Sequence, residues 1–136
     1  MPAPQQAVDQ QDIWKDKEMR AFAIALISHA LARLNAGEQN FTTDCVPENE
    51  RIVDGHPVGP GIAGSVLTKL QHANLVRPIG VVSYGIFYQR REKSSRPSAK
   101  TRYLNVYQLT SRASAMEFLH RHCVEVSPGQ LDFQTI

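Results

Sequence analysis

The 136-residue sequence predicts an α+β fold in which helices dominate the first half and strands the second. Two observations carry this prediction. Apolar residues recur at helical spacing over residues 12–36 and 60–74, as expected for helices that bury one face. β-Branched and aromatic residues instead gather over residues 81–88 and 103–110, as is typical of strands.

One folded domain is predicted over residues 12–123, with tails at 1–11 and 124–136. Hydrophobic residues make up 42% of the chain, enough to bury a core without a metal or disulfide. The net charge of +2 is unevenly divided, because residues 1–64 hold five Lys/Arg and nine Asp/Glu while residues 65–136 hold ten and four. The basic half therefore favours an anionic partner, on which it acts over about 8–10 Å.

The sequence has no feature that directs it to a membrane. Its start, MPAPQQAVDQQ, has neither the basic residues nor the apolar core of a signal peptide. The longest apolar stretch, AFAIALI, is much shorter than the ~20 residues that span a bilayer. We therefore expect a cytoplasmic protein without membrane contact, in which Cys45 and Cys123 are buried or half-buried thiols rather than a disulfide.

A long first helix is predicted from Asp12 to about Ala36. Asp12 is the expected N-cap, Asp16 and Glu18 lie in or near the first turns, and Gly37 is the expected glycine after the helix end. One face of this helix is apolar and consists of Met19, Ala23, Ile27, Ala30, Leu31 and Leu34.

The apolar surface of this helix is wider than one stripe. Phe22, Ala25 and Leu26 lie outside the main face and are not polar, so the helix must be covered on more than one side. A second copy of the chain would cover it in a two-fold dimer. Alternatively, the C-terminal tail folds back over it through Leu131 and Phe133.

The segment after Gly37 predicts short elements and a loop. Phe41 makes a short extended piece, and Thr42 or Thr43 caps a short second helix that runs through Cys45 and Val46 and extends at most to Ile52. The stretch DGHPVGPG has three glycines and two prolines in eight residues, which predicts an irregular loop.

A third helix is predicted from Pro60 to Asn74, because proline suits a first helical turn and the apolar spacing is regular. Its buried arc comprises Ile62, Ala63, Val66, Leu67, Leu70 and Ala73. The opposite arc has no acid and carries short hydrogen-bonding side chains or cations. Its candidate contact residues are Ser65, Thr68, Lys69 and His72.

A basic stretch, QRREKSSRPSAKTRY, joins the two predicted strands over residues 89–103. It holds one acid, Glu92, and six cations, Arg90, Arg91, Lys93, Arg96, Lys100 and Arg102. The strands and this loop predict a hairpin. A last helix, capped by Thr110 or Ser111, then runs to about His122.

This order of elements is that of a winged helix-turn-helix with a long N-terminal helix and a two- or three-stranded wing hairpin. Residues 60–74 would be the recognition helix and residues 87–103 the wing. A major groove accepts a helix whose outward side chains are short, polar or cationic. A flexible basic loop suits phosphates or a minor groove.

Three segments also resemble small winged-helix proteins encoded by phages and prophages. The segments are TTDCVPE, GIAGSVLTKLQHANLVRPIG and SSRPSAKTRYLNVYQL, which together span roughly residues 41–109, about half of the chain. Members of that family are mostly described as uncharacterised or as DNA-binding. The resemblance implies a winged helix and a phage or mobile-element origin. This chain departs from the pattern at Cys45, where an acid is common, and in its longer link before the wing.

Catalytic and metal-binding patterns are weak. His120 and His122 lie about 200° apart on a helix and cannot share an ion, and the carboxylates of the basic half are widely spaced. GPGIAG lacks the Lys-Ser/Thr of a phosphate-binding loop. A Ser or Cys nucleophile beside a His stays open, although no residue is singled out. We expect no enzyme, metal or cofactor.

The sequence therefore predicts a DNA-binding protein, regulatory or accessory to replication or recombination. The six cations of the basic stretch would neutralise phosphates, and the four candidate residues of the third helix would face the groove of double-stranded DNA. The alternative is a non-enzymatic adaptor, in which the basic loop grips an acidic protein partner.

Overall fold

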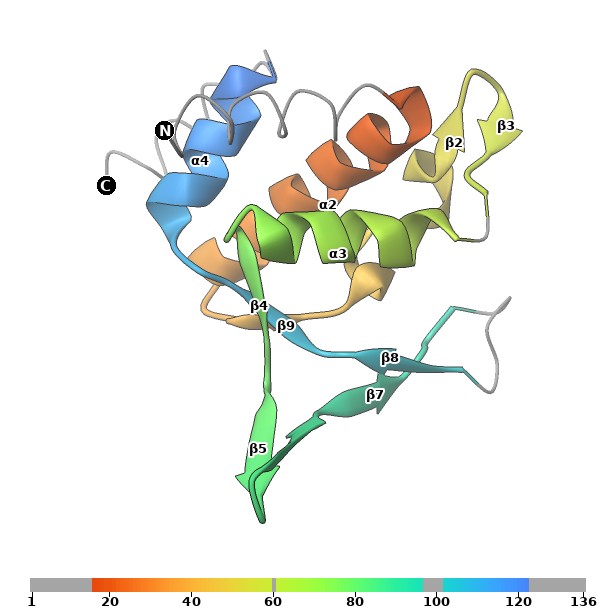
Figure 1. The fold of residues 1–136 in the computed structure, drawn as a ribbon. Coiled ribbons are helices and arrows are strands. Elements are labelled where there is room, and N and C mark those ends of the chain that lie inside the picture. The colour runs from red at the N-terminus through yellow and green to blue at the C-terminus, as the bar shows by residue number, and fades with distance from the viewer. Residues whose placement is uncertain (1–15, 60, 97–101, 123–136) are drawn as a thin grey trace.

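The computed structural model describes residues 16–59, 61–96 and 102–122. In these residues, helices α2 (Lys17–Asn35), α3 (Ile62–His72) and α4 (Arg112–Arg121) pack together above a small antiparallel sheet (Figure 1). Hairpins project from this body on two sides. No helix among the described residues is both long and apolar enough to cross a bilayer.

Helix α2 starts later than predicted and ends where predicted. Asp16 has extended backbone and its carboxylate accepts the Met19 N–H at 3.0 Å, so the helix begins at Lys17 and does not run unbroken from Asp12. Asp12 itself lies outside the described residues. Gly37 follows the helix at φ 92°, which confirms its predicted place.

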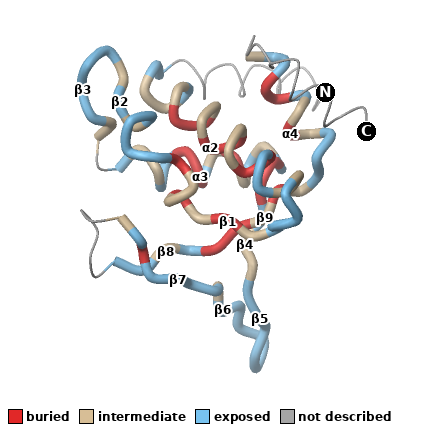
Figure 2. The backbone as a smooth tube through the Cα atoms, turned by 180° about the vertical axis from the view of Figure 1, so that it is seen from behind, coloured by how far each residue is buried: buried red, intermediate tan, exposed pale blue. Residues whose placement is uncertain are grey.

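The wide apolar surface of α2 is covered within the chain. Phe22 and Leu26 are buried and Ala25 is half-buried, because α3 packs on one side of α2 and α4 on another (Figure 2). The strip that suggested a dimer through this helix is therefore part of the core. Leu131 and Phe133, the alternative cover, lie outside the described residues.

The central sheet has the strand order β1-β9-β4 and is antiparallel throughout. Its strands are β1 (Asn40–Phe41), β4 (Val76–Pro78) and β9 (Tyr107–Leu109). Phe41 pairs with Tyr107, and their rings lie 6.3 Å apart. The sheet and the helices bury one continuous core, to which α4 contributes Phe118 and Leu119.

The segment between β1 and α3 is more regular than predicted. Two 3-10 turns, η1 (Thr43–Cys45) and η2 (Glu48–Glu50), take the place of the short second helix. The stretch predicted as an irregular loop contains the hairpin of β2 (Ile52–Val53) and β3 (His56–Pro57). Positive φ at Asp54–Gly55 forms its two-residue turn, a combination typical of hairpins.

The predicted strand at 81–88 was wrong, because this segment folds back on itself. Strands β5 (Gly80–Ser83) and β6 (Ile86–Gln89) form a hairpin around Tyr84 and Gly85, which both have positive φ. The basic stretch belongs to a second hairpin, β7 (Arg91–Lys93) with β8 (Tyr103–Asn105). Residues on both sides of the basic loop do pair, as predicted. The strand that precedes the loop is β7, however, and not the segment 81–88.

Helix α4 is confirmed with its predicted cap. The Ser111 hydroxyl accepts the Ser114 N–H at 3.0 Å. The last turn places His122 against Phe118, with ring centroids 4.5 Å apart. Burial and the nearby charges of Arg121 and Arg20 lower the pKa of His122.

Gly80→Ala is expected to destabilise the β5–β6 hairpin by about 1–3 kcal/mol, as overpacking does. A Cβ at Gly80 would lie 2.2 Å from the Tyr88 carbonyl oxygen and 2.8 Å from the Gln89 Cα, both backbone atoms. Hydrogen exchange of the hairpin amides measures this effect. Gly64→Ala is the matched control, because its Cβ meets nothing within 4 Å, and it should leave the hairpin unchanged. Equal protection of the hairpin in both variants would contradict the close approach.

Candidate functional site

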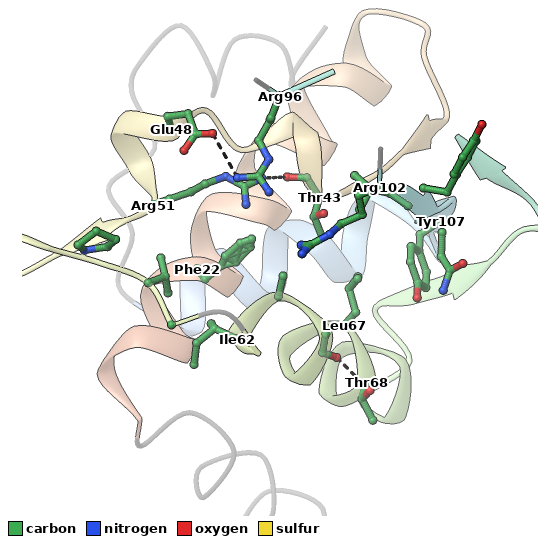
Figure 3. A pocket seen from close by; sticks show the side chains of 18 of the residues that line it. Phe22, Thr43, Glu48, Arg51, Ile62, Leu67, Thr68, Arg96, Arg102 and Tyr107 are labelled. Carbon is green, nitrogen blue, oxygen red and sulfur yellow. Dashed lines mark hydrogen bonds and ion pairs between the residues drawn. The ribbon is translucent and has the colours of Figure 1, made fainter. Parts of the chain in front are cut away.

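An open groove of about 1050 Å³ lies between α3 and the β7–β8 hairpin, and residues of the 43–59 segment close its third side (Figure 3). We call it the arginine groove. Its α3 wall is Ile62, Ala63, Gly64, Leu67 and Thr68, and its strand wall is Arg91, Arg102, Tyr103, Leu104, Asn105 and Tyr107. Among the described residues, four arginines from three different segments line it, and the one acid that lines it is Glu48.

Asp44 fixes one end of the basic loop against the body. Its carboxylate accepts the Ser95 N–H at 2.7 Å and the Ser94 hydroxyl at 2.8 Å, and Arg96 Nε donates to its second oxygen at 3.2 Å. Arg96 also pairs with Glu48 at 3.2 Å. We call these five residues the Asp44 latch. It joins segments about fifty residues apart in the chain.

The latch includes Arg96, one of the predicted phosphate contacts. Its side chain is only 20% exposed and is held by two carboxylates. Lys100, the next predicted phosphate contact, lies outside the described residues.

Competing effects act on the pKa of Asp44. Burial raises it, whereas the Ser95 N–H, the Ser94 and Ser95 hydroxyls and the Arg96 charge lower it. The hydrogen bonds and the charge outweigh burial, so the pKa lies below its ordinary value of 3.8. Asp44 is therefore ionised under all ordinary conditions and holds the loop as a carboxylate.

Arg51 is a groove residue that sequence reasoning missed. Its guanidinium donates to the backbone oxygens of Val46, at 2.9 Å, and of Thr43, and it lies 5.3 Å from the centre of the Phe22 ring. Burial and the nearby charge of Arg96 lower its pKa. The available signal was a single arginine after the acids of PENE, in a stretch otherwise without cations.

Arg91 and Arg102 are exposed, whereas Arg51 and Arg96 are half-buried. The structure gives neither side chain an ion pair within the residues it describes. Figure 3 shows Arg102 directed into the groove, on the side opposite Leu67 and Thr68 of α3. Of the other predicted phosphate contacts, Lys93 is exposed, and Arg90 is exposed but pairs with Glu92 at 3.3 Å.

The exposed side of α3 presents the predicted contact residues unevenly. Ser65, Thr68 and His72 are exposed and Lys69 is half-buried. Thr68 alone among them lines the arginine groove, while Ser65 and His72 lie roughly 40–60° further round the helix. The Thr68 hydroxyl donates to the Gly64 carbonyl at 3.0 Å and keeps its lone pairs free to accept.

The described residues contain one cysteine and no cluster of metal-binding side chains. Cys45 is half-buried, as predicted, and burial raises its pKa to about 12, so the thiol stays protonated and unreactive. Cys123 lies outside the described residues. Within 16–59, 61–96 and 102–122, no three His, Cys, Asp or Glu side chains come close enough to hold a metal ion.

Comparisons of the chain with known protein families, with curated proteins and with solved structures find no match. The resemblance to the phage and prophage proteins therefore stays a prediction. The arginine groove must be interpreted from its own geometry and charge.

Proposed function

We propose that the chain is a winged-helix protein that binds nucleic acid, double-stranded DNA in the first place, with α3 and the β7–β8 hairpin on either side of a sugar-phosphate backbone. The observation that carries this proposal is the arginine groove. It brings Arg91 and Arg102 of the hairpin opposite a helix face without acids.

The fold supports the proposal. The chain passes from α2 through β1 to α3, then through β4, two hairpins and β9. Strand β9 lies between β1 and β4, so the basic hairpin leaves the sheet beside α3. A wing placed this way contacts the phosphates that flank a helix lying in the major groove.

The chemistry of the groove walls suits a polyanion. Arg91 and Arg102 are exposed and have no carboxylate partner in the described residues, so phosphate can replace water around them at low cost. Arg51, whose guanidinium donates to backbone oxygens, adds positive charge behind them. On α3, Ser65, Thr68 and His72 are short enough to let the helix approach base edges.

A salt titration of binding to random-sequence duplex DNA tests the proposal. In Arg91→Glu/Arg102→Glu, affinity should fall similarly on all sequences, because both contacts are to phosphate. The slope of log K against log salt should become less steep by about 1.8, since each lost phosphate contact contributes about 0.9. Fluorescence anisotropy from low to high salt measures both quantities.

The matched control is Arg20→Glu/Arg112→Glu, which changes the net charge equally at exposed positions on α2 and α4. Its slope should stay close to that of the unmodified chain. An equal loss of DNA affinity in both double variants would show that the effect comes from net charge alone. Unchanged affinity in Arg91→Glu/Arg102→Glu would show that the groove does not bind nucleic acid. No DNA binding by the unmodified chain would favour the adaptor, with an acidic protein in the groove.

A further inference from the structure

The β5–β6 hairpin projects away from the three helices, and its residues are largely exposed (Figures 1 and 2). It carries large apolar side chains that the described residues leave exposed. The side chains in question are 48% exposed or more. They are Val81, Val82, Tyr84, Ile86, Phe87 and Tyr88. This is the largest collection of exposed apolar side chains among the described residues, and a patch of this kind marks an interaction surface.

Both faces of the hairpin are apolar. Val81 pairs with Tyr88, and Val82 pairs with Phe87 on the opposite face, because neighbouring residues of a strand point to opposite sides. A hairpin that simply lay on its own domain would keep one polar face. The partner of this hairpin must therefore cover both faces or extend its edges.

The turn points to a contact at the tip. Tyr84 is fully exposed and has φ 51°, a backbone conformation that costs a bulky side chain roughly 1 kcal/mol or more. Asn or Gly would occupy this turn position without that cost. An aromatic side chain at a strained, fully exposed position is typical of a functional contact.

Charge restricts what the partner is. Residues 78–89 contain no Asp, Glu, Lys or Arg, although Arg77 and Arg90 stand at either end. A nucleic acid or an acidic protein would find no cation on the hairpin. A second copy presents an equally uncharged surface, so pairing the two desolvates no charge.

We propose that the β5–β6 hairpin is a self-association element that pairs with the same hairpin of a second copy of this chain. Within the described residues β5 pairs only with β6, so every second residue leaves its backbone N–H and C=O pointing outward at each edge. Antiparallel pairing of an edge with its own copy satisfies these groups and is self-complementary about a two-fold axis. It also makes a four-stranded sheet from hairpins that are marginal alone.

The exposed apolar area is of the size that an interface needs. The aromatic side chains, the valines and the isoleucine expose roughly 600–800 Å² over the two faces of one hairpin, and a stable interface buries about 800 Å² per partner. Edge pairing places the apolar side chains of the two copies side by side on each face and buries part of this area. This proposal does not depend on nucleic-acid binding by the arginine groove, because the two surfaces share no residue.

Analytical ultracentrifugation of the full chain tests it. The unmodified chain should show a mass twice the monomer's 15.2 kDa, with dissociation on dilution. Val82→Lys/Phe87→Glu removes apolar surface but places opposite charges across the same strand pair, so the hairpin itself is retained and the mass should fall to that of a monomer. Tyr84→Asn should favour the turn yet weaken association.

The matched control is Val53→Lys/His56→Glu, the same charge pair beside the turn of the β2–β3 hairpin, and it should remain a dimer. A monomeric unmodified chain at about 200 µM would overturn the proposal. Loss of the dimer in the control would overturn the assignment to β5–β6. Binding of a monomeric chain to phosphatidylcholine vesicles, abolished by Val82→Lys/Phe87→Glu, would replace the second copy with a lipid surface.

Discussion

Leu70→Ala should lower the free energy of unfolding by about 2–5 kcal/mol, as truncation of a buried leucine does. Leu70 is 0% exposed and lies in the last turn of α3, where it packs into the core shared by the helices and the sheet. Thr68→Ala, two residues earlier on the same helix, should change the free energy of unfolding by less than about 0.5 kcal/mol, because Thr68 is exposed. Urea unfolding followed by circular dichroism measures both variants.

The comparison tests the rotation of α3 about its axis, on which the arginine groove depends. If Thr68→Ala were as costly as Leu70→Ala, the helix would present a different face to the hairpin. The Thr68 hydroxyl makes one hydrogen bond, to the Gly64 carbonyl, within its own helix, and alanine leaves that carbonyl in its helical bond. A small or slightly favourable change is therefore the expected result for Thr68→Ala.

Features that depend on local patterns were predictable. The apolar spacing of the third helix correctly placed Val66, Leu67 and Leu70 in the core. Local chemistry also located Gly37 after the first helix and Ser111 before the last. In each case, the residues that decide the structure lie within one or two helical turns of each other.

Features that depend on tertiary contacts were not predictable. The β-forming residues after α3 are compatible both with the single long hairpin that was predicted and with the two hairpins, β5–β6 and β7–β8, that form. The turn at Tyr84–Gly85, which separates the two, lacks the usual Asn-Gly or Asp-Gly signal. Arg96 was grouped with the other cations because its partner Asp44 lies about fifty residues away. A basic run shows which residues are positive, but only the fold shows which of them already have a carboxylate.

Asp44→Ala should destabilise the protein by about 2–3 kcal/mol, because hydrogen bonds to a charged group contribute about 1.5–3 kcal/mol and their donors would lose their acceptor. The Asp44 side chain is 12% exposed and accepts from Ser94, Ser95 and Arg96. Asp54→Asn is the matched control, because asparagine tolerates the positive φ of this turn position and removes only the charge. Asp54 pairs with Lys17 at 2.8 Å, but both side chains are 64% exposed, so its loss should cost no more than about 1 kcal/mol.

The effect of Asp44→Ala should depend on pH in a defined direction. The pKa of Asp44 is lowered in the folded protein, so its contribution to stability is fully present above the ordinary value of 3.8 and is lost as pH falls through the folded pKa. Urea unfolding at a series of pH values should thus show a constant difference in the free energy of unfolding between the unmodified chain and Asp44→Ala near neutrality; we call this difference the gap. The gap should narrow only below pH 3.8.

Asp44→Ala also distinguishes a local opening of the Asp44 latch from a general loss of stability. Hydrogen exchange should increase at Ser94 and Ser95, where the Ser95 N–H loses its acceptor, before it increases in α3. Among the described residues, Arg96 would keep the Glu48 carboxylate as its ion-pair partner, and Glu48 is more exposed than Asp44. A gap that persisted unchanged well below pH 3.8, or unaltered exchange at Ser95, would show that the Asp44 carboxylate does not hold the basic loop against the body.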